Sequence, residues 1–501
     1  MSAFPHPARR FPAGVVRALS ATALAAALAG CAVGPDFAAP TPGLEDMRLE
    51  ARGGAPRQVL TPDPVPRDWW RLLEDPVLDG LIARAWRGNL DLQAAAERVA
   101  QSRAQAGVVM SQLFPQVSLS ASQSREAISE NGPMARLGAS TAAHDLWQAG
   151  FDASWELDVW GRVRRMREGS LATLQATELE ARGAQVSLSA EIARQYLALR
   201  GVQRRLAIAR QNEAIAAHLV RLAQSRQANG VATRYDLASA RAQQATVQAL
   251  VPQLDEQQNV LLNGLALLLG EAPRSLDALL MPVRPLPQGA PRLPVGLPSA
   301  LAQRRPDIQR AEARLHAATA AIGVARADFY PRISLAGGFG TQAFDEEDLG
   351  LWRSTNFFVG PRIHLPLFEG GRLTRTLELT ESRQREAAIA YRQTVLHAWH
   401  EVDNALNALR AQQLRQQALD EALAQSRDAL RAAESSYRAG AADYVTVLSA
   451  QRALLASELE QTDAATGSVV AVVYLYKALG GGWAPDAAAS DATAPVAGAA
   501  P

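Results

Sequence analysis

The amino-acid sequence predicts an α+β protein in which one arrangement of helices and strands occurs twice. Three observations lead to this expectation. Segments of the 501-residue chain resemble each other at a spacing of about 210 residues. Proline is missing from 134–251 and from 367–484, which permits very long helices. Between these helical stretches, short segments alternate between apolar and polar residues, as β-strands with two different faces do.

The repeat is visible in matched short motifs. Asn89-Leu-Asp-Leu-Gln aligns with Arg305-Pro-Asp-Ile-Gln, and Gly161-Arg aligns with Gly371-Arg. A duplicated unit therefore describes the chain better than the three unrelated domains that its length alone would suggest. The expected segments are a signal peptide (1–30), an N-terminal segment (31–88), the first repeat (89–270), a proline-rich connector (271–304), the second repeat (305–480) and a disordered tail (481–501).

Each repeat is expected to contain one very long helix and two shorter helices. The proline-free stretches are rich in alanine, leucine, glutamine, arginine and glutamate, which are good helix formers. A long helix of this kind would extend for roughly 100 Å, and two shorter helices stacked end to end would match it. The expected helices are 89–113, 162–228 and 233–270 in the first repeat, and 305–329, 372–438 and 443–479 in the second.

Four segments are expected to form strands, two in each repeat. They are 115–122, 151–159, 333–339 and 357–367. In the second of them, alternation places Asp152, Glu156 and Asp158 on one side and apolar residues on the other. This pattern is typical of a transmembrane β-barrel strand, but a soluble antiparallel sheet alternates in the same way.

The N-terminus has the features of a secretory signal peptide. The positively charged Arg9, Arg10 and Arg17 precede the apolar stretch 18–30, which is too short to span a bilayer. This leader places the chain where membrane barrels occur, and it therefore favours the barrel interpretation of the strands.

Cys31 is the sole cysteine of the chain, which excludes an intramolecular disulfide and zinc sites built on two or more cysteines. The preceding Leu28-Ala-Gly resembles a bacterial lipobox, in which the cysteine receives diacylglycerol and an N-acyl group such as palmitate and becomes the new N-terminus. Ala32 follows instead of aspartate, which by the same resemblance favours the outer membrane. We therefore expect Cys31 to carry a lipid anchor.

Composition narrows the function further. The net charge of +1 argues against a nucleic-acid partner, and 48% hydrophobic residues suffice for a core.

No later segment offers about 20 consecutive apolar residues, so a membrane crossing would have to be a closed β-barrel. Four strands cannot close a barrel, because the smallest membrane barrels have about eight. Two copies of the chain would supply eight strands, and three would supply twelve.

Five motifs point to a known family. They are Cys31-Ala-Val-Gly-Pro-Asp-Phe37, Trp155-Glu-Leu-Asp-Val-Trp-Gly-Arg162, Leu297-Pro-Ser-Ala-Leu-Ala-Gln-Arg-Arg-Pro-Asp-Ile308, Phe329-Tyr-Pro-Arg-Ile-Ser-Leu335 and Pro366-Leu-Phe-Glu-Gly-Gly-Arg372. Together they resemble the outer-membrane factor (TolC-like) family, in its lipoprotein branch of RND-type drug-efflux channels. The resemblance extends from Cys31 to about residue 480.

The resemblance implies a particular architecture and particular partners. The expected assembly is a homotrimer with a twelve-stranded outer-membrane β-barrel, to which each chain gives four strands. This barrel would continue into a twelve-helix periplasmic α-barrel, with a mixed equatorial belt to which 31–88 and 271–304 contribute. The implied partners are a periplasmic adaptor (membrane fusion) protein, an inner-membrane efflux pump and outer-membrane lipid.

The resemblance also implies a gate at the periplasmic tip, formed by the two turns between long helices. In relatives, the helix after the second turn carries an aspartate and, three residues on, an arginine that narrow the closed pore. Here Ser449 stands where the aspartate is expected, while Arg452 is retained. Asp236 and Asp443 would supply negative charge nearby, or each would simply cap its helix N-terminus.

Other candidate sites are weaker. The acidic strand residues would line the lumen of the barrel; they are Asp152, Glu156 and Asp158. Three basic residues of the second repeat would offset their negative charge: Arg332, Arg362 and His364. The run from His397 to Glu401 lacks the HExxH pattern, and we expect a solvated helix face there instead of a metal site. We also expect no catalytic activity and no cofactor apart from the lipid.

The leading hypothesis is therefore a passive exit channel for drugs or other small molecules in a tripartite efflux system of the outer membrane. One alternative keeps the channel but changes its cargo to metal cations or secreted proteins. Another is a lipid-anchored structural coiled-coil protein without a channel. The pump selects the cargo, so this sequence leaves the substrates open.

Overall fold

The computed structural model describes residues 32–41, 43, 59–287, 292–296 and 301–483. The chain divides into two compact units, each made of three separate stretches. Unit 1 is 1–40, 100–176 and 311–391, and unit 2 is 41–99, 177–310 and 392–501. Each unit therefore takes a part of both sequence repeats, and the boundaries of the units differ from those of the repeats.

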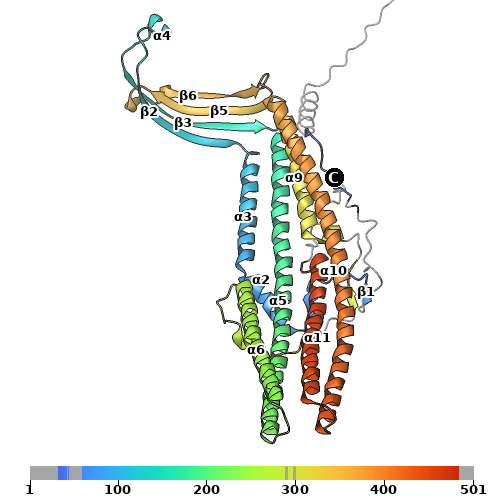
Figure 1. Ribbon diagram of the computed structural model, residues 1–501. Coiled ribbons are helices and arrows are strands. Elements are labelled where there is room, and N and C mark those ends of the chain that lie inside the picture. The colour runs from blue at the N-terminus through green and yellow to red at the C-terminus, as the bar shows by residue number, and fades with distance from the viewer. Residues whose placement is uncertain (1–31, 42, 44–58, 288–291, 297–300, 484–501) are drawn as a thin grey trace, which may run out of the picture. The chain divides into compact units, whose positions relative to one another are not determined.

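A four-stranded antiparallel sheet is the central feature of unit 1 (Figure 1). Its strands are β2 (Gln116–Glu126), β3 (His144–Leu157), β5 (Arg332–Ala343) and β6 (Thr355–His364). They lie in the order β2-β3-β5-β6, so β2 and β6 are its two edges. The loops of this sheet contain α4 (Pro133–Arg136) and two short 3-10 helices, η3 (Glu346–Asp348) and η4 (Trp352–Ser354).

The strand register separates an apolar face from a polar one. Leu119, Phe151, Phe339 and Phe357 pair in succession across the four strands and form one row of the apolar face. All four side chains are more than half exposed. A large apolar surface left open to solvent is unusual for an isolated soluble sheet, so this face calls for an apolar environment.

Four long or medium helices pass through both units, and two further helices lie in unit 2. They are α3 (Leu90–Ser111), α5 (Arg162–Ala228), α9 (Pro306–Ala327), α10 (Arg372–Arg438), α6 (Arg234–Leu269) and α11 (Tyr444–Ala478). The two 67-residue helices, α5 and α10, begin and end at the residues expected from the sequence. The others agree within two residues at each end.

Packing between α5, α6 and α11 forms part of the core of unit 2. Leu206 of α5 packs with Leu254 of α6, and Ile208 of α5 packs with Leu455 of α11. The smaller elements of unit 2 are β1 (Val59–Thr61), η1 (Trp69–Leu73), α2 (Pro76–Gly88), α7 (Asp277–Leu280), β4 (Arg292–Pro294) and α8 (Leu301–Arg304). The short strands β1 and β4 pair in parallel.

The strand ends differ from the sequence expectation. β6 stops at His364, three residues before the expected end at residue 367, where its pairing with Arg332 at the start of β5 also ends. β3 begins seven residues earlier than expected, at His144, and ends at Leu157. Within the described residues, each helix is too short or too polar to cross a bilayer.

The start of the expected disordered tail is also corrected. Trp483 is 7% exposed, and its indole N–H donates to the carbonyl oxygen of Arg304 at 2.8 Å. Residues 481–483 therefore belong to the packed part of unit 2. The rest of that segment, 484–501, lies outside the described residues.

Candidate pore-lining and gating residues

Two of the three expected acidic residues lie on the polar face of β3. Asp152 is exposed and makes no ion pair within the described residues. Glu156 is paired with Arg162 at the start of α5, with Nε–Oε1 and Nη2–Oε2 distances of 2.9 and 2.7 Å. The charge of Glu156 is therefore largely compensated, and that of Asp152 is not.

Asp158 does not belong to the strand face, and this part of the sequence prediction is wrong. β3 ends at Leu157, and the carboxylate of Asp158 accepts hydrogen bonds from the backbone N–H groups of Val163 and Arg164 at 2.9 and 2.8 Å. Those groups lie in the first turn of α5, whose N–H groups have no partners within the helix. Asp158 therefore stabilises the start of α5.

The two turns between long helices have the same backbone geometry. Gly230 and Gly440 each follow a 67-residue helix with φ values of +73° and +75°. The next residue donates its N–H back to the helix at 2.9 Å in both cases, from Val231 to Arg226 and from Ala441 to Ser436. Glycine suits this left-handed position because it lacks a Cβ.

Asp236 and Asp443 cap the helices that follow these turns. Asp236 forms a capping box with Thr233, in which each side chain bonds the other's backbone N–H. The Asp443 carboxylate accepts hydrogen bonds from the hydroxyl and the N–H of Thr446 at 2.7 and 2.9 Å, which lower its pKa. Capping was one of the two roles left open by the sequence, and it is the one the geometry supports.

Ser449 and Arg452 lie one turn apart on α11, and both are exposed. The Nε group of Arg452 donates to Oε1 of Gln243 on α6 at 2.5 Å. Gln243 is 7% exposed, so the contact ties the surface of α11 to a buried position of α6. Nothing in the sequence singles out Gln243, because its partner lies 209 positions away.

Cys31 lies outside the described residues, but the residues that follow it contact other parts of unit 1. The N–H of Val33 donates to the carbonyl oxygen of Trp160 at 3.0 Å. Asp36 pairs with Arg165 of α5 at 2.6 Å, and the Phe37 ring stacks on His316 at 4.3 Å between centroids. The chain is therefore held against the start of α5 immediately after the expected lipid anchor.

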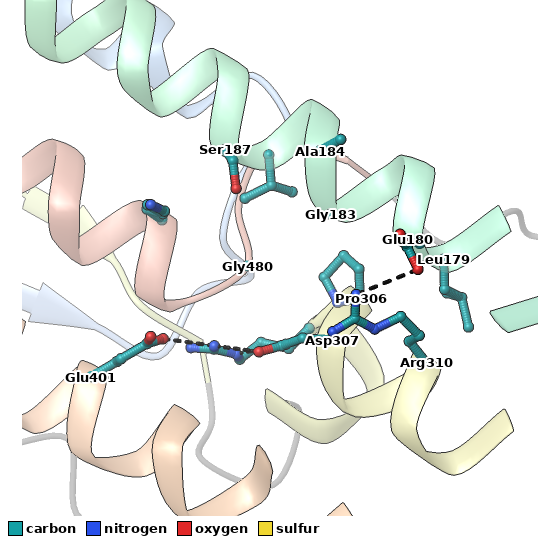
Figure 2. Close-up of a pocket in the computed structure, with 13 residues that line it drawn as sticks. Leu179, Glu180, Gly183, Ala184, Ser187, Pro306, Asp307, Arg310, Glu401 and Gly480 are labelled. Carbon is teal, nitrogen blue, oxygen red and sulfur yellow. Dashed lines mark hydrogen bonds and ion pairs between the residues drawn. The ribbon is translucent and has the colours of Figure 1, made fainter. Parts of the chain in front are cut away.

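A cavity of about 470 Å³ in unit 2 is lined by α5, α9, α10 and α11 (Figure 2). Arg305 is 6% exposed and forms ion pairs with two acidic residues that line the cavity. Its Nη2 atom lies 2.6 Å from the Asp307 carboxylate and 2.7 Å from the Glu401 carboxylate. Its Nη1 donates to the carbonyl oxygen of Ala478 at 2.7 Å. The cavity wall also contains Lys477, the sole lysine of the chain.

Burial and Arg305 act in opposite directions on Asp307. Burial by itself raises the pKa of Asp307, but the hydrogen bonds and charge of Arg305 outweigh it, and the pKa lies below its usual range. The sequence motif that contains both residues points to the place where α9 starts. It does not reveal that Arg305 also reaches Glu401 of α10.

The described residues contain no group of three or more histidine, cysteine or acidic side chains that would hold a metal ion. In the run from His397 to Glu401, the glutamate is the ion-pair partner of Arg305.

Comparisons with known proteins agree with this architecture. The family model described as outer membrane efflux protein matches residues 81–271 and 297–481. The pyoverdine export outer membrane protein OpmQ of Pseudomonas putida is 35% identical over 83% of this chain and 88% of its own. Outer membrane protein OprJ of Pseudomonas aeruginosa is 33% identical, over 93% of this chain and 96% of its own.

Solved structures share the fold. The outer-membrane channel OprN superposes with a TM-score of 0.84 at 33% identity, over 91% of this chain and all of that one. The open-state MtrE outer membrane channel of Neisseria gonorrhoeae gives 0.77 at 27% identity, over 90% and 98%. The fold is thus that of an outer-membrane channel subunit.

The chain belongs to the outer membrane efflux protein family, as its sequence motifs indicate. Its place is the outer membrane, and its role is efflux. The family consists of channel proteins.

Proposed function

We propose that three copies of this chain form a passive duct through the outer membrane, which carries drugs or other small molecules outward. The observation that carries this proposal is the four-stranded sheet of unit 1, with its exposed apolar face and two free edges. An apolar face suits lipid, and a membrane-spanning sheet must pair every edge. The chain itself performs no catalysis in this scheme.

The number of strands supports a closed ring of several copies. Because the sheet is antiparallel and has four strands, β6 of one copy runs antiparallel to β2 of the next. Two copies would make a barrel of about eight strands, whose interior is just filled by its own side chains. Three copies would make about twelve strands and leave room for a solute.

The cargo and the partners follow from relatives. The names of three relatives refer to pyoverdine, antibiotics and toluene, which are chemically different small molecules. A duct that serves such different compounds would leave selection to a pump. We therefore assign this chain to a tripartite system with a periplasmic adaptor protein and an inner-membrane efflux pump, with no nucleic acid involved.

Pore formation tests the proposal directly. Purified full-length protein should migrate as a heat-modifiable trimer and should form conducting pores in planar lipid bilayers. A monomer in detergent that forms no pores would contradict the duct. A structural coiled-coil tether would show neither property.

Lipidation of Cys31 is a second part of the proposal. The contacts of residues 33–37 with Trp160, Arg165 and His316 would place a diacylglycerol and an N-acyl chain near the start of α5. Intact mass spectrometry of protein from membranes should show a chain that starts at Cys31 with added acyl mass, which Cys31→Ser should lose. An unmodified cysteine in the wild-type protein would refute the anchor.

A further inference from the structure

The polar face of the sheet carries very little charge over most of its length. Cross-strand pairing arranges this face in rows, and four successive rows pass through Gln148, Gly150, Asp152 and Ser154 of β3. Their other members in β2, β5 and β6 are serine, glutamine, asparagine, alanine or glycine, with one exception, Phe358. Among the described strands, these rows therefore contain one carboxylate and one aromatic ring.

Both exceptional residues lie in the same row. Ser118, Asp152, Gly338 and Phe358 pair in succession from β2 to β6. The nearest compensated charges lie two polar rows away, where Glu156 is paired with Ser334, and Ser334 with Arg362. Asp152 therefore has no cation in its own row to neutralise it.

Gly338 lets the Phe358 ring approach Asp152. A Cβ on Gly338 would lie 2.5 Å from Cε1 of Phe358, so the ring covers the backbone where a side chain would otherwise stand. Gly338 belongs to β5, which lies between β6 and β3 (Figure 1). Because the Phe358 ring covers Gly338, it extends from β6 toward the strand of Asp152. Phe358 and Asp152 both line a hollow of about 180 Å³ on this face.

A carboxylate beside an exposed aromatic face is suited to an organic cation. The carboxylate attracts the positive charge, and the negative face of the ring attracts both the charge and its apolar substituents. Ring coverage of a cross-strand glycine also stabilises a sheet, so a purely structural role for Phe358 is the alternative. That role does not require an uncompensated carboxylate in the same row.

We propose that Asp152 and Phe358 form a binding site for apolar organic cations on the wall of the duct. The site rests on the proposed function, in which this face lines the lumen. Three copies of the chain would place three carboxylates and three rings at one level. The pump still selects the cargo, and among the compounds that it delivers, the duct wall would hold cationic amphiphilic compounds more strongly than anions of the same size.

Block of the open pore by tetraphenylphosphonium tests the site in planar bilayers. The wild-type pore should be blocked by tetraphenylphosphonium at lower concentrations than by tetraphenylborate, an anion of similar size. Asp152→Asn and Phe358→Leu should each weaken the cation block by about fivefold to tenfold. Asp152→Asn should also reduce the cation-to-anion permeability ratio, whereas Phe358→Leu should leave that ratio unchanged.

Matched variants separate binding from folding. Phe357→Leu and Asp145→Asn change the same residue types on the opposite face of the sheet. Pores of these two variants should be blocked by tetraphenylphosphonium as strongly as the wild-type pore. Phe358→Tyr keeps the ring and should retain the block, even if Phe358→Leu fails to assemble. Conducting pores in which wild type and Asp152→Asn are blocked equally, with no preference for the cation over the anion, would overturn the site and leave the duct intact. A wild-type protein without conductance would overturn both.

Discussion

Replacing Arg305 by methionine is expected to lower the free energy of unfolding by about 2–3 kcal/mol. Methionine keeps the apolar stem but leaves Asp307 and Glu401 without the cation between them, and it frees the carbonyl oxygen of Ala478. This loss of stability is smaller than that expected for a fully buried ion pair, because the side chains of Asp307 and Glu401 are 35% and 53% exposed. Denaturant unfolding followed by circular dichroism measures it.

The effect of Arg305→Met should depend on pH. The pKa of Asp307 is lowered in the folded protein, so the stability it contributes is present above its unfolded value of 3.8. That contribution is lost as the pH falls through the lowered folded value. The difference in the free energy of unfolding between wild type and Arg305→Met should therefore be largest near neutral pH, and it should become smaller below about pH 4.

A control exists on the wall of the same cavity. Arg310→Met removes a looser pair, in which Arg310 lies 3.7 Å from Glu180 and is 35% exposed, and it should cost less than about 1 kcal/mol. Equal losses from the two variants, or a gap that stays constant with pH, would show that Arg305 does not act through its carboxylate partners.

Arg452→Ala is expected to open the channel. It removes the hydrogen bond from α11 to Gln243 of α6, and a bond with a charged donor contributes about 1.5–3 kcal/mol. If that bond holds the closed state, its loss should raise a small open population by about tenfold or more. Single-channel recordings in bilayers should show this as higher conductance or open probability, and cells should leak antibiotics inward.

Two further variants give the Arg452 result its meaning. Gln243→Ala should open the channel as well if the hydrogen bond matters, and should leave it unchanged if Arg452 acts only by its charge in the pore. Arg438→Ala removes an exposed arginine near the same turn, paired with Glu434, and should have no effect. Unchanged conductance in Arg452→Ala would remove this residue from the constriction.

The fold was largely predictable because its signals are local. Absence of proline and abundance of good helix formers determine where a helix can run, and α5 and α10 match residue for residue. Strand positions followed from alternation, but their ends did not. Alternation continues through Asp158 after β3 has ended, because the next side chains happen to repeat the pattern.

The site was less predictable because its contacts join distant segments. Asp36 and Arg165, or Arg452 and Gln243, meet only after the chain has folded, and no spacing in the sequence pairs them. Phe358 had a visible signal, since it interrupts the alternation of apolar Phe357 and Val359 with a second aromatic residue. An aromatic residue at a polar position of an alternating strand indicates that the polar face carries an aromatic ring at that level.

Lys477 has a chemical consequence. Of the 51 lysine and arginine residues, all others are arginines, whose guanidinium groups stay protonated far into the alkaline range. The cation of nearly every ion pair in this protein is therefore an arginine, which keeps its positive charge at alkaline pH. In a lysine-rich chain the corresponding cations would lose their charge near pH 10. With an N-acylated Cys31, each subunit would also have a single free amine, on the wall of one cavity.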